Sequence, residues 1–518
     1  MFDLIISGGT VYDGAGGMPR RVDVGISGGR IAALDELSGV ESHERFDASG
    51  MAVMPGFIDV HTHSDMELFL HPNREEALCQ GVTTEIAGAC GLALFPMRDS
   101  GFAETVTGIY GCRARTFATC GEYMDALPET GVNVAAQLAH SPLRYALCGF
   151  DDRPLPRREA HRLVCEAFEE GACSFSTGLA YYPASFSDTD EIVEICRTAA
   201  EYDVPICVHQ RSALRRPDMR FDSREEVLEF ARGSGIRVHY SHYRTTLNTA
   251  GKLDALLEPI ERGLSEGLRV TADFYPYPVG AGYAAVNLPM SVMTGGFERI
   301  IERLSDPVWR RKILADWRNR PGFISNGIVI HAPRHEEYLN RSYQEIAAGL
   351  GTDVPEMLYD LLLEEKLEVA FRPDTGDAAE SSAMLENDFI ELMRKPYFMF
   401  GSDTLPGHAF PHPRSYGAFA KMLRLAIKHH VPLSLFANRA SGIPAALFGL
   451  TGRGVIAPGN IADICVFCPD KVRECSSFDM PKRLAQGMEL VTVNGKIAVR
   501  NSHATGICAG IPVKRQFR

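Results

Sequence analysis

The sequence lacks any apolar run that approaches the roughly 18 residues needed to span a membrane as a helix. Its opening stretch, MFDLIISGGTVYDG, lacks the basic segment followed by a long apolar segment that is typical of a secretory signal. The composition, with 45% apolar and 23% charged residues, is typical of a soluble globular protein. We therefore expect neither a membrane anchor nor a secretory leader.

An excess of basic residues is also missing. The chain has 53 Lys and Arg residues against 66 Asp and Glu residues, which gives a formal net charge of −13. Nucleic acids and anionic membranes repel an acidic protein, so neither is expected as a partner. The charge indicates nothing further about function.

The thirteen cysteines show no regular spacing, and their number is odd. We therefore expect no disulfide framework, and reduced thiols in a cytoplasmic protein are the preferred interpretation. One CxxC pair, Cys465 and Cys468, lies in the apolar run ICVFC with no second Cys or His pair nearby. We interpret this pair as core packing of a strand rather than as a metal site.

The two ends of the chain share one pattern of short β-rich runs broken by glycine. FDLIISGGTVYDG and RRVDVGISGGRIAAL stand near the start, and GVIAPGNIADICVFCPD and LVTVNGKIAVRN stand near the end. The VNGK step is an Asn-Gly turn between two apolar runs, which is typical of a β-hairpin. We predict one small β-sandwich domain built from residues 1–54 and 450–518.

The middle of the chain alternates strand-like and helix-like runs. Helical patterns such as 190–203 and 223–235 lie between eight β-rich runs that end in polar residues. These runs are GFIDVHTH (56–63), TTEIAGAC (83–90), NVAAQLAH (133–140), ACSFSTGL (172–179), VPICVHQ (204–210), RVHYSH (237–242), RVTADFYPY (269–277) and YFMFGSD (397–403). Repeated βα units imply parallel strands with right-handed crossovers. Eight of them predict an α/β fold with a closed (β/α)8 TIM barrel over residues 55–449.

The interval between the seventh and eighth runs, about 278–396, is too long for one βα connection. We therefore predict an insertion between barrel strands 7 and 8. A lid or subdomain within about 278–345 would form part of it.

Residues suited to metal binding and proton transfer stand at the ends of five predicted strands. They are His61 with His63, Cys90, His209, His242 and Asp403. In a TIM barrel the chemistry lies at the carboxyl ends of the strands. Neutral imidazole and thiolate suit zinc, and an aspartate can bind a metal or move protons.

Each of these residues has an ordinary structural explanation when it is taken alone. A single strand-end histidine is most often hydrogen bonded in the core, Cys90 suits a small buried apolar position, and Asp403 suits a helix cap. The joint pattern favours a metal centre. Side chains alternate along a strand, so the two imidazoles of the HxH motif point to one face, and the other candidates recur at the ends of separate strands of the same barrel.

Several motifs resemble those of the N-acyl-D-amino-acid deacylases (D-aminoacylases), a family within the metal-dependent amidohydrolase superfamily. MPGFIDVHTHSD resembles the first-strand signature of the superfamily, and GVTTEIAGACG resembles the strand-2 block of the deacylases. Further similar blocks are STGLAYYPASFSDTDEI, VHQR, YSHYR, YPY, GSDTLPGHAFPHPR and GRGVIAPGNIADICVFCPD. The likeness runs nearly from end to end of the chain.

The resemblance implies zinc-dependent hydrolysis of the linear amide bond of N-acyl-D-amino acids, a reaction of class EC 3.5.1. Cys90, His209 and His242 would hold a tightly bound zinc. His61 and His63 would define a second, weaker metal position. Asp403 would lie between metal and substrate, contact the metal, and act first as general base and then as general acid.

The resemblance also implies that Arg244, Tyr275 and Arg414 contact the substrate and hold its carboxylate. Arg244 stands where the family usually has a lysine, which keeps the charge but changes the reach and the hydrogen-bonding geometry. Ala281 stands where a serine is usual, which removes one expected hydrogen bond to the carboxylate. Thr404 follows the GSD motif where a glycine is usual, and the strand-5 block reads HQR where an acidic residue commonly follows. These departures leave the side chain and the acyl group of the substrate open.

Two other classes of protein share parts of this pattern. A cyclic-amide hydrolase of the hydantoinase or dihydroorotase type has the same barrel and a similar HxH motif, but it normally bridges two metals with a carboxylated lysine. Cys90 in strand 2 and the GSD…PHPR block disfavour it. A metal-free scaffold would have lost ligands, and here every one is present. The number of metals and the oligomeric state remain open.

Overall fold

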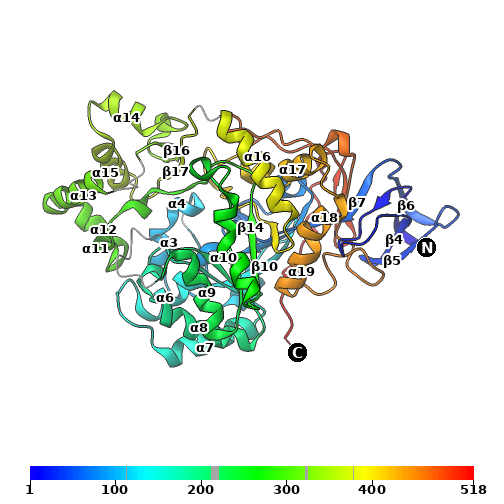
Figure 1. Ribbon diagram of the computed structural model, residues 1–518, viewed down its shortest axis with the longest axis horizontal. Helices are drawn as coiled ribbons and strands as arrows, with labels where there is room; N and C mark the ends of the chain where they lie inside the picture. Colours follow the sequence, from blue (N-terminus) through cyan, green and yellow to red (C-terminus); the bar gives the residue numbers. More distant parts are fainter. Residues whose placement is uncertain (113, 212–220, 321–324, 377–378, 518) are drawn as a thin grey trace.

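The computed structural model describes residues 1–112, 114–211, 221–320, 325–376 and 379–517. Its central element is a sheet of eight parallel strands, hydrogen bonded in the order β18-β14-β13-β12-β11-β10-β9-β8 (Figure 1). The strands are β8 (Phe57–Asp59), β9 (Val82–Ala87), β10 (Asn133–Ala139), β11 (Ser174–Gly178), β12 (Pro205–His209), β13 (Arg237–Tyr240), β14 (Val270–Phe274) and β18 (Phe398–Phe400). Each of the eight predicted runs supplies most or all of one of these strands.

The first and last strands of this sheet meet, which closes the barrel. The Val60 N–H donates to the Phe400 carbonyl at 3.4 Å, and the Asp403 N–H donates to the His61 carbonyl at 2.9 Å. Thr62 and Thr404 form a parallel bridge just beyond the strand ends. The predicted TIM barrel is therefore confirmed, and its seam joins the two segments that carry His61 and Asp403.

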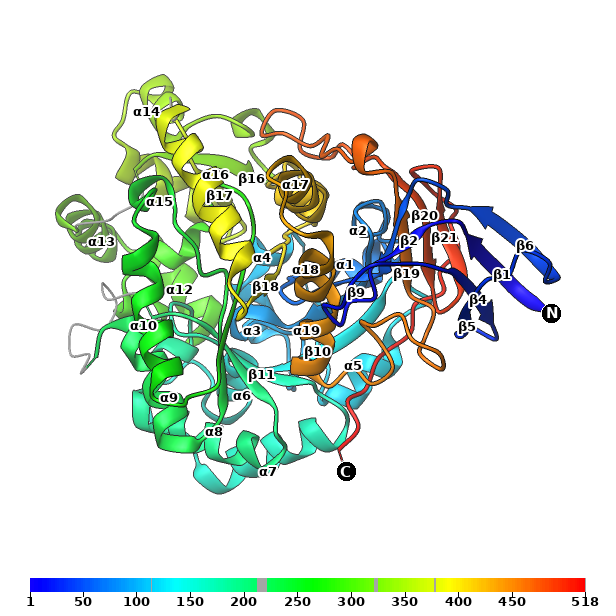
Figure 2. The same cartoon turned by 45° about the vertical axis from the view of Figure 1, so that its right-hand side comes forward.

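Helices cover the outer face of the barrel (Figures 1 and 2). The helices α8 (Thr189–Glu201) and α9 (Ser223–Ser234) correspond to the two predicted helical patterns. The Asp188 side chain caps α8 by accepting from the Glu191 N–H, and α9 ends at Gly235, whose φ of 75° suits glycine. The other helices around the barrel are α5 (Cys120–Ala126), α6 (His140–Cys148), α7 (Arg157–Glu169), α10 (Leu253–Ser265), α16 (Ala379–Arg394), α17 (Arg414–Lys428), α18 (Leu433–Ala437) and α19 (Ile443–Phe448).

Four short helices flank β9 in the chain, namely α1 (Glu67–Leu70), α2 (Glu75–Leu78), α3 (Gly101–Thr105) and α4 (Thr107–Tyr110). Among the described residues, no helix combines the length and the apolar character needed to cross a membrane.

The chain between β14 and β18 builds an additional layer beside the barrel, on the side away from the N-terminus (Figure 1). Its elements are β15 (Gly282–Tyr283), α11 (Met290–Met293), α12 (Gly296–Ser305), α13 (Pro307–Asn319), β16 (Gly327–His331), α14 (Tyr343–Leu350), α15 (Val354–Glu364) and β17 (Ala370–Pro373). The three strands form an antiparallel sheet in the order β15-β17-β16. These elements continue past residue 345, and the division of the chain into domains stays a prediction.

Strands from both ends of the chain share one sheet of seven strands (Figure 2). In sheet order they are β22 (His503–Ala504), β21 (Lys496–Arg500), β20 (Met488–Val493), β19 (Ile464–Phe467), β7 (Ala52–Pro55), β2 (Thr10–Val11) and β3 (Arg20–Arg21). A second sheet contains β5 (Arg30–Asp35), β4 (Asp23–Ser27), β1 (Phe2–Ser7) and β6 (Ser42–Asp47). The two sheets share one buried apolar cluster, which includes Ile6, Val24, Val53 and Val466.

Cys465, of the CxxC pair, is fully buried within β19, as expected for core packing. All thirteen cysteines lie among the described residues, and none of them forms a disulfide.

A buried ion pair joins the terminal sheet to the base of the barrel. The Asp463 carboxylate pairs with Arg453, and it also accepts from the Asn494 N–H at 2.7 Å and from the Asn133 side chain of β10 at 3.1 Å. Arg453 and Asp463 are only 7% and 6% exposed. A buried carboxylate without its cationic partner is strongly unfavourable, so the position of the terminal sheet depends on this pair.

We expect Arg453→Met to lower the free energy of unfolding by about 3–5 kcal/mol, because it leaves the Asp463 carboxylate buried and uncompensated. Urea unfolding followed by circular dichroism measures the change. Arg453→Met combined with Asp463→Leu should recover part of the loss, because the charge is then removed together with its partner. A loss below about 1 kcal/mol for the single variant, the range of exposed pairs, would contradict the role of this pair.

Candidate functional site

The six candidate residues lie together at the carboxyl end of the barrel. His209 is the last residue of β12, and the other five follow the ends of β8, β9, β13 and β18 within a few residues. The described residues include three groups whose ligand atoms lie within 4.8 Å of one another. These groups are His61, His63 and Cys90; Cys90, His209 and His242; and His61, His242 and Asp403.

Cys90 is the centre of this cluster. Its Sγ lies 3.2 Å from Nε2 of His61, 3.5 Å from Nδ1 of His209 and 3.6 Å from Nε2 of His242. Burial alone raises the pKa of the Cys90 thiol, but the charges of these three imidazoles lower it well below its ordinary value. Cys90 is therefore disposed to be a thiolate, the form that binds metals.

Asp403 lies beside the two histidines of the HxH motif. Its Oδ1 is 3.4 Å from Nε2 of His63 and 3.5 Å from Nε2 of His61, and its Oδ2 is 2.9 Å from Nη1 of Arg414. Burial alone raises the pKa of Asp403, but the Arg414 guanidinium and the nearby imidazoles hold it well below its ordinary value. The carboxylate is therefore ionised, and it faces the same small volume as Cys90.

The backbone is strained at three of these positions. Cys90 has a φ of 54°, His242 a φ of 40° and Asp403 a φ of 54°, which is the left-handed region that favours glycine. Such a conformation costs on the order of 1–3 kcal/mol per residue and persists only where its surroundings enforce it. Strain at three residues that meet in one cluster indicates a functional site.

Gly401, in the GSD motif, lies where β18 passes His61. A Cβ atom at this position would stand 2.6 Å from Cβ of His61 and 2.9 Å from Oδ1 of Asp273. A side chain would therefore displace the HxH motif, so the close approach of β18 to β8 requires glycine.

The three residues expected to contact substrate lie next to one another. The Arg244 guanidinium stacks 4.1 Å above the Tyr275 ring, and the Arg414 guanidinium lies 4.7 Å from the same ring. Nη1 of Arg414 donates to the Tyr275 hydroxyl at 2.8 Å, and the same atom forms an ion pair with Oδ2 of Asp403. Arg414 is therefore placed to orient Asp403, whether or not it also touches a substrate.

A cavity of about 170 Å³ opens beside the cluster. Its lining residues are His63, Ile109, Tyr181, His209, His242, Tyr275, Gly280, Ala281, Asp403 and Leu405. Arg244 and Arg414 are not among them, although their guanidinium groups lie 4.1 and 4.7 Å from the centre of the Tyr275 ring. Ala281 supplies a methyl group at the wall, where the family usually has a serine hydroxyl.

Sequence reasoning missed Asp273, His239 and Tyr181. The Asp273 carboxylate bonds to the imidazoles of His61 and His239, and the Tyr181 hydroxyl lies 3.4 Å from Nδ1 of His209. A signal for Asp273 was present, because a charged residue inside the apolar run RVTADFYPY is costly to bury without partners. His239 and Tyr181 have no comparable signal, since their contacts depend on the closure of the barrel.

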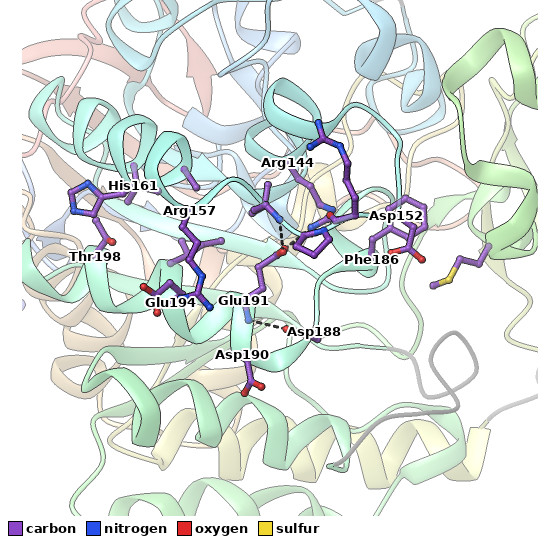
Figure 3. Close-up of a pocket in the computed structure, with 17 residues that line it drawn as sticks. Arg144, Asp152, Arg157, His161, Phe186, Asp188, Asp190, Glu191, Glu194 and Thr198 are labelled. Carbon is purple, nitrogen blue, oxygen red and sulfur yellow. Dashed lines mark hydrogen bonds and ion pairs between the residues drawn. The ribbon is translucent and has the colours of Figure 1, made fainter.

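A larger cavity of about 700 Å³ lies between α7 and α8, outside the barrel (Figure 3). Its lining combines apolar side chains such as Leu155 and Ile195 with charged side chains such as Arg157 and Glu194. Arg144 and Glu191 form an ion pair within its lining. None of the candidate site residues lines it, so we assign the chemistry to the smaller cavity.

The loop between Asp403 and the PHPR motif is held by a buried histidine. Nε2 of His408 lies 2.7 Å from the Gly108 carbonyl, and the His408 ring stacks on His331 of the inserted layer at 5.5 Å. Burial, the nearby His331 and the Arg414 charge together lower the pKa of His408 from 6.5 to about 3. His408 is therefore neutral in the folded protein over the physiological range.

A family model described as "Amidohydrolase family" matches residues 44–499 of the chain. The N-acyl-D-glutamate deacylase of Alcaligenes xylosoxydans xylosoxydans is 33% identical over 502 residues, which cover 95% of this chain and 93% of that protein. The D-aminoacylase of the same organism is 30% identical over 522 residues, which cover 98% and 97% of the two chains.

Solved structures of deacylases are also similar to this chain over nearly its whole length. The N-acyl-D-glutamate deacylase of Bordetella bronchiseptica, in complex with zinc and a phosphonate inhibitor, superposes with a TM-score of 0.81 at 29% identity over 99% of both chains. A D-hydantoinase superposes with a TM-score of 0.59 at 16% identity over 100% of this chain and 99% of its own, which shows the shared fold alone.

We expect His408→Asn to reduce the acid sensitivity of the fold. Between about pH 6.5 and pH 3 the unfolded chain binds a proton at His408 and the folded protein does not, so stability falls as the pH falls. Each pH unit should cost the wild-type protein about 1.4 kcal/mol more than the variant. Urea unfolding at pH 6, 5 and 4 measures both slopes, and parallel slopes would contradict the assignment.

Proposed function

Because the chain belongs to the amidohydrolase family, and within it to the N-acyl-D-amino-acid deacylases, we propose that it hydrolyses the amide bond of N-acyl-D-amino acids. The products are a carboxylate and a free D-amino acid. The convergence of a thiolate, four imidazoles and a carboxylate on one buried cluster supports this reaction above all other features. That donor set combines a metal site with a group that can carry protons.

The donor set fits zinc. In tetrahedral zinc sites, sulfur and nitrogen ligands lie about 3.5 Å apart, and the Sγ of Cys90 lies 3.5 and 3.6 Å from the facing nitrogens of His209 and His242. Those two nitrogens are 2.7 Å apart, so a shared ion requires their rings to separate slightly. Cys90, His209 and His242 would hold this zinc, and His61 with His63 would form a second, weaker position.

When bound, zinc supplies a Lewis acid that polarises an amide carbonyl and lowers the pKa of a coordinated water towards neutrality. Asp403 accepts a proton as the water attacks the acyl carbon, and it then donates that proton to the leaving nitrogen. The low pKa of Asp403 keeps the carboxylate ionised before the reaction. It also makes the proton easy to release in the second step.

Arg244 and Tyr275 are proposed to hold the substrate carboxylate, with Arg414 behind them. Tyr275 lines the cavity, and the guanidinium groups of Arg244 and Arg414 close to its ring add positive charge at this wall. With the carboxylate and the amide both fixed, only one enantiomer can direct its side chain into the remaining space. Such an anchor would make the enzyme enantioselective, and the similarity to deacylases of D-amino acids identifies the D-enantiomer as the expected substrate.

The proposal includes a cytoplasmic location, which is supported by the thirteen free cysteines. The alternative of a cyclic-amide hydrolase is not favoured, because Cys90 occupies the strand-2 position where those enzymes normally carry a carboxylated lysine.

Purified, zinc-loaded protein should release free amino acids from N-acetyl-D-amino acids and leave the L-compounds intact. Amine release measured across a panel of both enantiomers, with hydantoins and dihydroorotate alongside, tests this expectation. Turnover confined to D-compounds also identifies the preferred side chain. Ring opening of a cyclic amide without deacylation would overturn the proposal in favour of the cyclic-amide alternative.

Asp403→Asn should lower kcat by at least about 10²–10⁴-fold, because one carboxylate handles two proton transfers and each contributes on the order of that factor. Metal analysis of the same sample must show zinc bound as in the wild-type protein. Near-wild-type turnover by a zinc-replete variant would show that another group moves the protons.

A further inference from the structure

Asp273 lies in β14, directly beneath the cluster. It is fully buried, and both of its oxygens face groups that belong to other strands. A buried carboxylate is tolerated only where several donors satisfy it, so its partners reveal its role.

Three nitrogen atoms surround the Asp273 carboxylate. Oδ1 accepts from the His242 N–H at 2.9 Å, and Oδ2 lies 3.2 Å from Nδ1 of His61 and 2.9 Å from Nε2 of His239. The other nitrogen of His239, Nδ1, lies 2.9 Å from the Thr271 hydroxyl. Two residues of β14, Thr271 and Asp273, therefore bond to the two nitrogens of the His239 ring. These bonds fix the orientation of the Asp273 carboxylate.

The donor and acceptor properties of these groups determine which nitrogen of His61 carries the proton. An ionised carboxylate carries no hydrogen and can only accept, so Nδ1 of His61 must donate to it. In the neutral form of the ring, which is the form that binds a metal, the other nitrogen, Nε2, then carries the lone pair. That lone pair faces Sγ of Cys90 at 3.2 Å and the Asp403 carboxylate at 3.5 Å.

The same carboxylate acts on a second strand end. His242 has a φ of 40°, and its N–H points at Oδ1 of Asp273. A charge-assisted hydrogen bond offsets part of the strain at this residue. One side chain thus controls the tautomer of His61 and the backbone of His242.

We propose that Asp273 is the positioning residue of the metal centre: it sets His61 in the tautomer that binds metal and holds the strained turn that presents His242. The role rests on the proposed function, since it needs a metal in the cluster. Carboxylates that bond to the far nitrogen of a metal-binding histidine typically contribute 10- to 100-fold to metal affinity.

Asp273→Asn tests the role with almost no change of shape. If the amide oxygen keeps its bond to the His242 N–H, the amide NH₂ faces Nδ1 of His61. That nitrogen must then accept, which moves the ring proton to Nε2 and directs an N–H at the metal position. If the amide is rotated the other way, its NH₂ group faces the His242 N–H. Two donors then face each other, and the hydrogen bond is lost. Both arrangements weaken the site.

Asp463→Asn is the matched control. Asp463 is also a buried aspartate with three donors, at the base of the barrel and outside the cluster. Zinc dissociation constants are measured for both variants by competition with a chromogenic chelator, after circular dichroism shows that they are folded. The visible spectrum of the cobalt-substituted proteins reports the ligand geometry.

We expect Asp273→Asn to bind zinc roughly 10- to 100-fold more weakly and to show an altered cobalt spectrum. Asp463→Asn should lose stability but keep the wild-type zinc affinity and the wild-type cobalt spectrum. A folded Asp273→Asn protein with wild-type affinity and spectrum overturns the role. If that variant does not fold, a neutron structure of the zinc-loaded wild-type protein tests the role instead. Deuterium on Nε2 of His61, and not on Nδ1, would overturn the proposed role of Asp273.

These measurements need no substrate, so they separate this role from the reaction itself. A wild-type protein that binds zinc but leaves the D-compounds intact overturns the proposed deacylation and leaves the effect of Asp273 measurable. A wild-type protein that fails to bind zinc overturns the metal centre, and the role of Asp273 with it.

Discussion

The eight barrel strands run in the same direction, and this constraint brings the reactive groups of the protein together. Parallel strands in a closed barrel end at one face, so side chains separated by more than 300 residues in the chain meet within a few ångströms. Asp403 and Asp273 are tolerated as buried charges at that face because each is paired, Asp403 with Arg414 and Asp273 with His61 and His239. Loss of one partner leaves the other charge buried without compensation.

Much of this arrangement could be predicted from the sequence because it depends on local patterns. Eight β-rich runs predicted eight strands, and a histidine, cysteine or aspartate at the end of five of them predicted the cluster. The HxH motif was informative because alternation along a strand is a property of the backbone itself. The apolar run ICVFC likewise predicted a strand, and Cys465 lies in β19, whereas Cys468 lies just beyond its end.

What could not be predicted depends on contacts between distant segments. Asp273 stood out as a charge within an apolar run, but its partners became known only once β8, β13 and β14 lay side by side. The left-handed backbone at Cys90, His242 and Asp403 has no signature in residue types that favour other conformations. For the inserted layer, the sequence predicted only that an insertion exists, from the length of the interval. Its strands β15, β16 and β17 are short and pair with one another, so they leave no clear pattern in the sequence. The preference for a substrate side chain also depends on such contacts, because the cavity wall combines a residue of β12 with residues from the segments that follow β8, β14 and β18.

The seven-stranded sheet shared by the two ends of the chain imposes an order on biosynthesis. In the folded protein one edge of β7 pairs with β2, which is made before it, and the other edge pairs with β19, which leaves the ribosome more than 400 residues later. At elongation rates of about 5–20 residues per second, that edge waits for at least about 20 seconds. An unpaired strand edge is a template for association with other chains. The nascent polypeptide therefore has an interval in which protection by a chaperone, or rapid closure of the barrel beside it, decides how much of the protein reaches its native state.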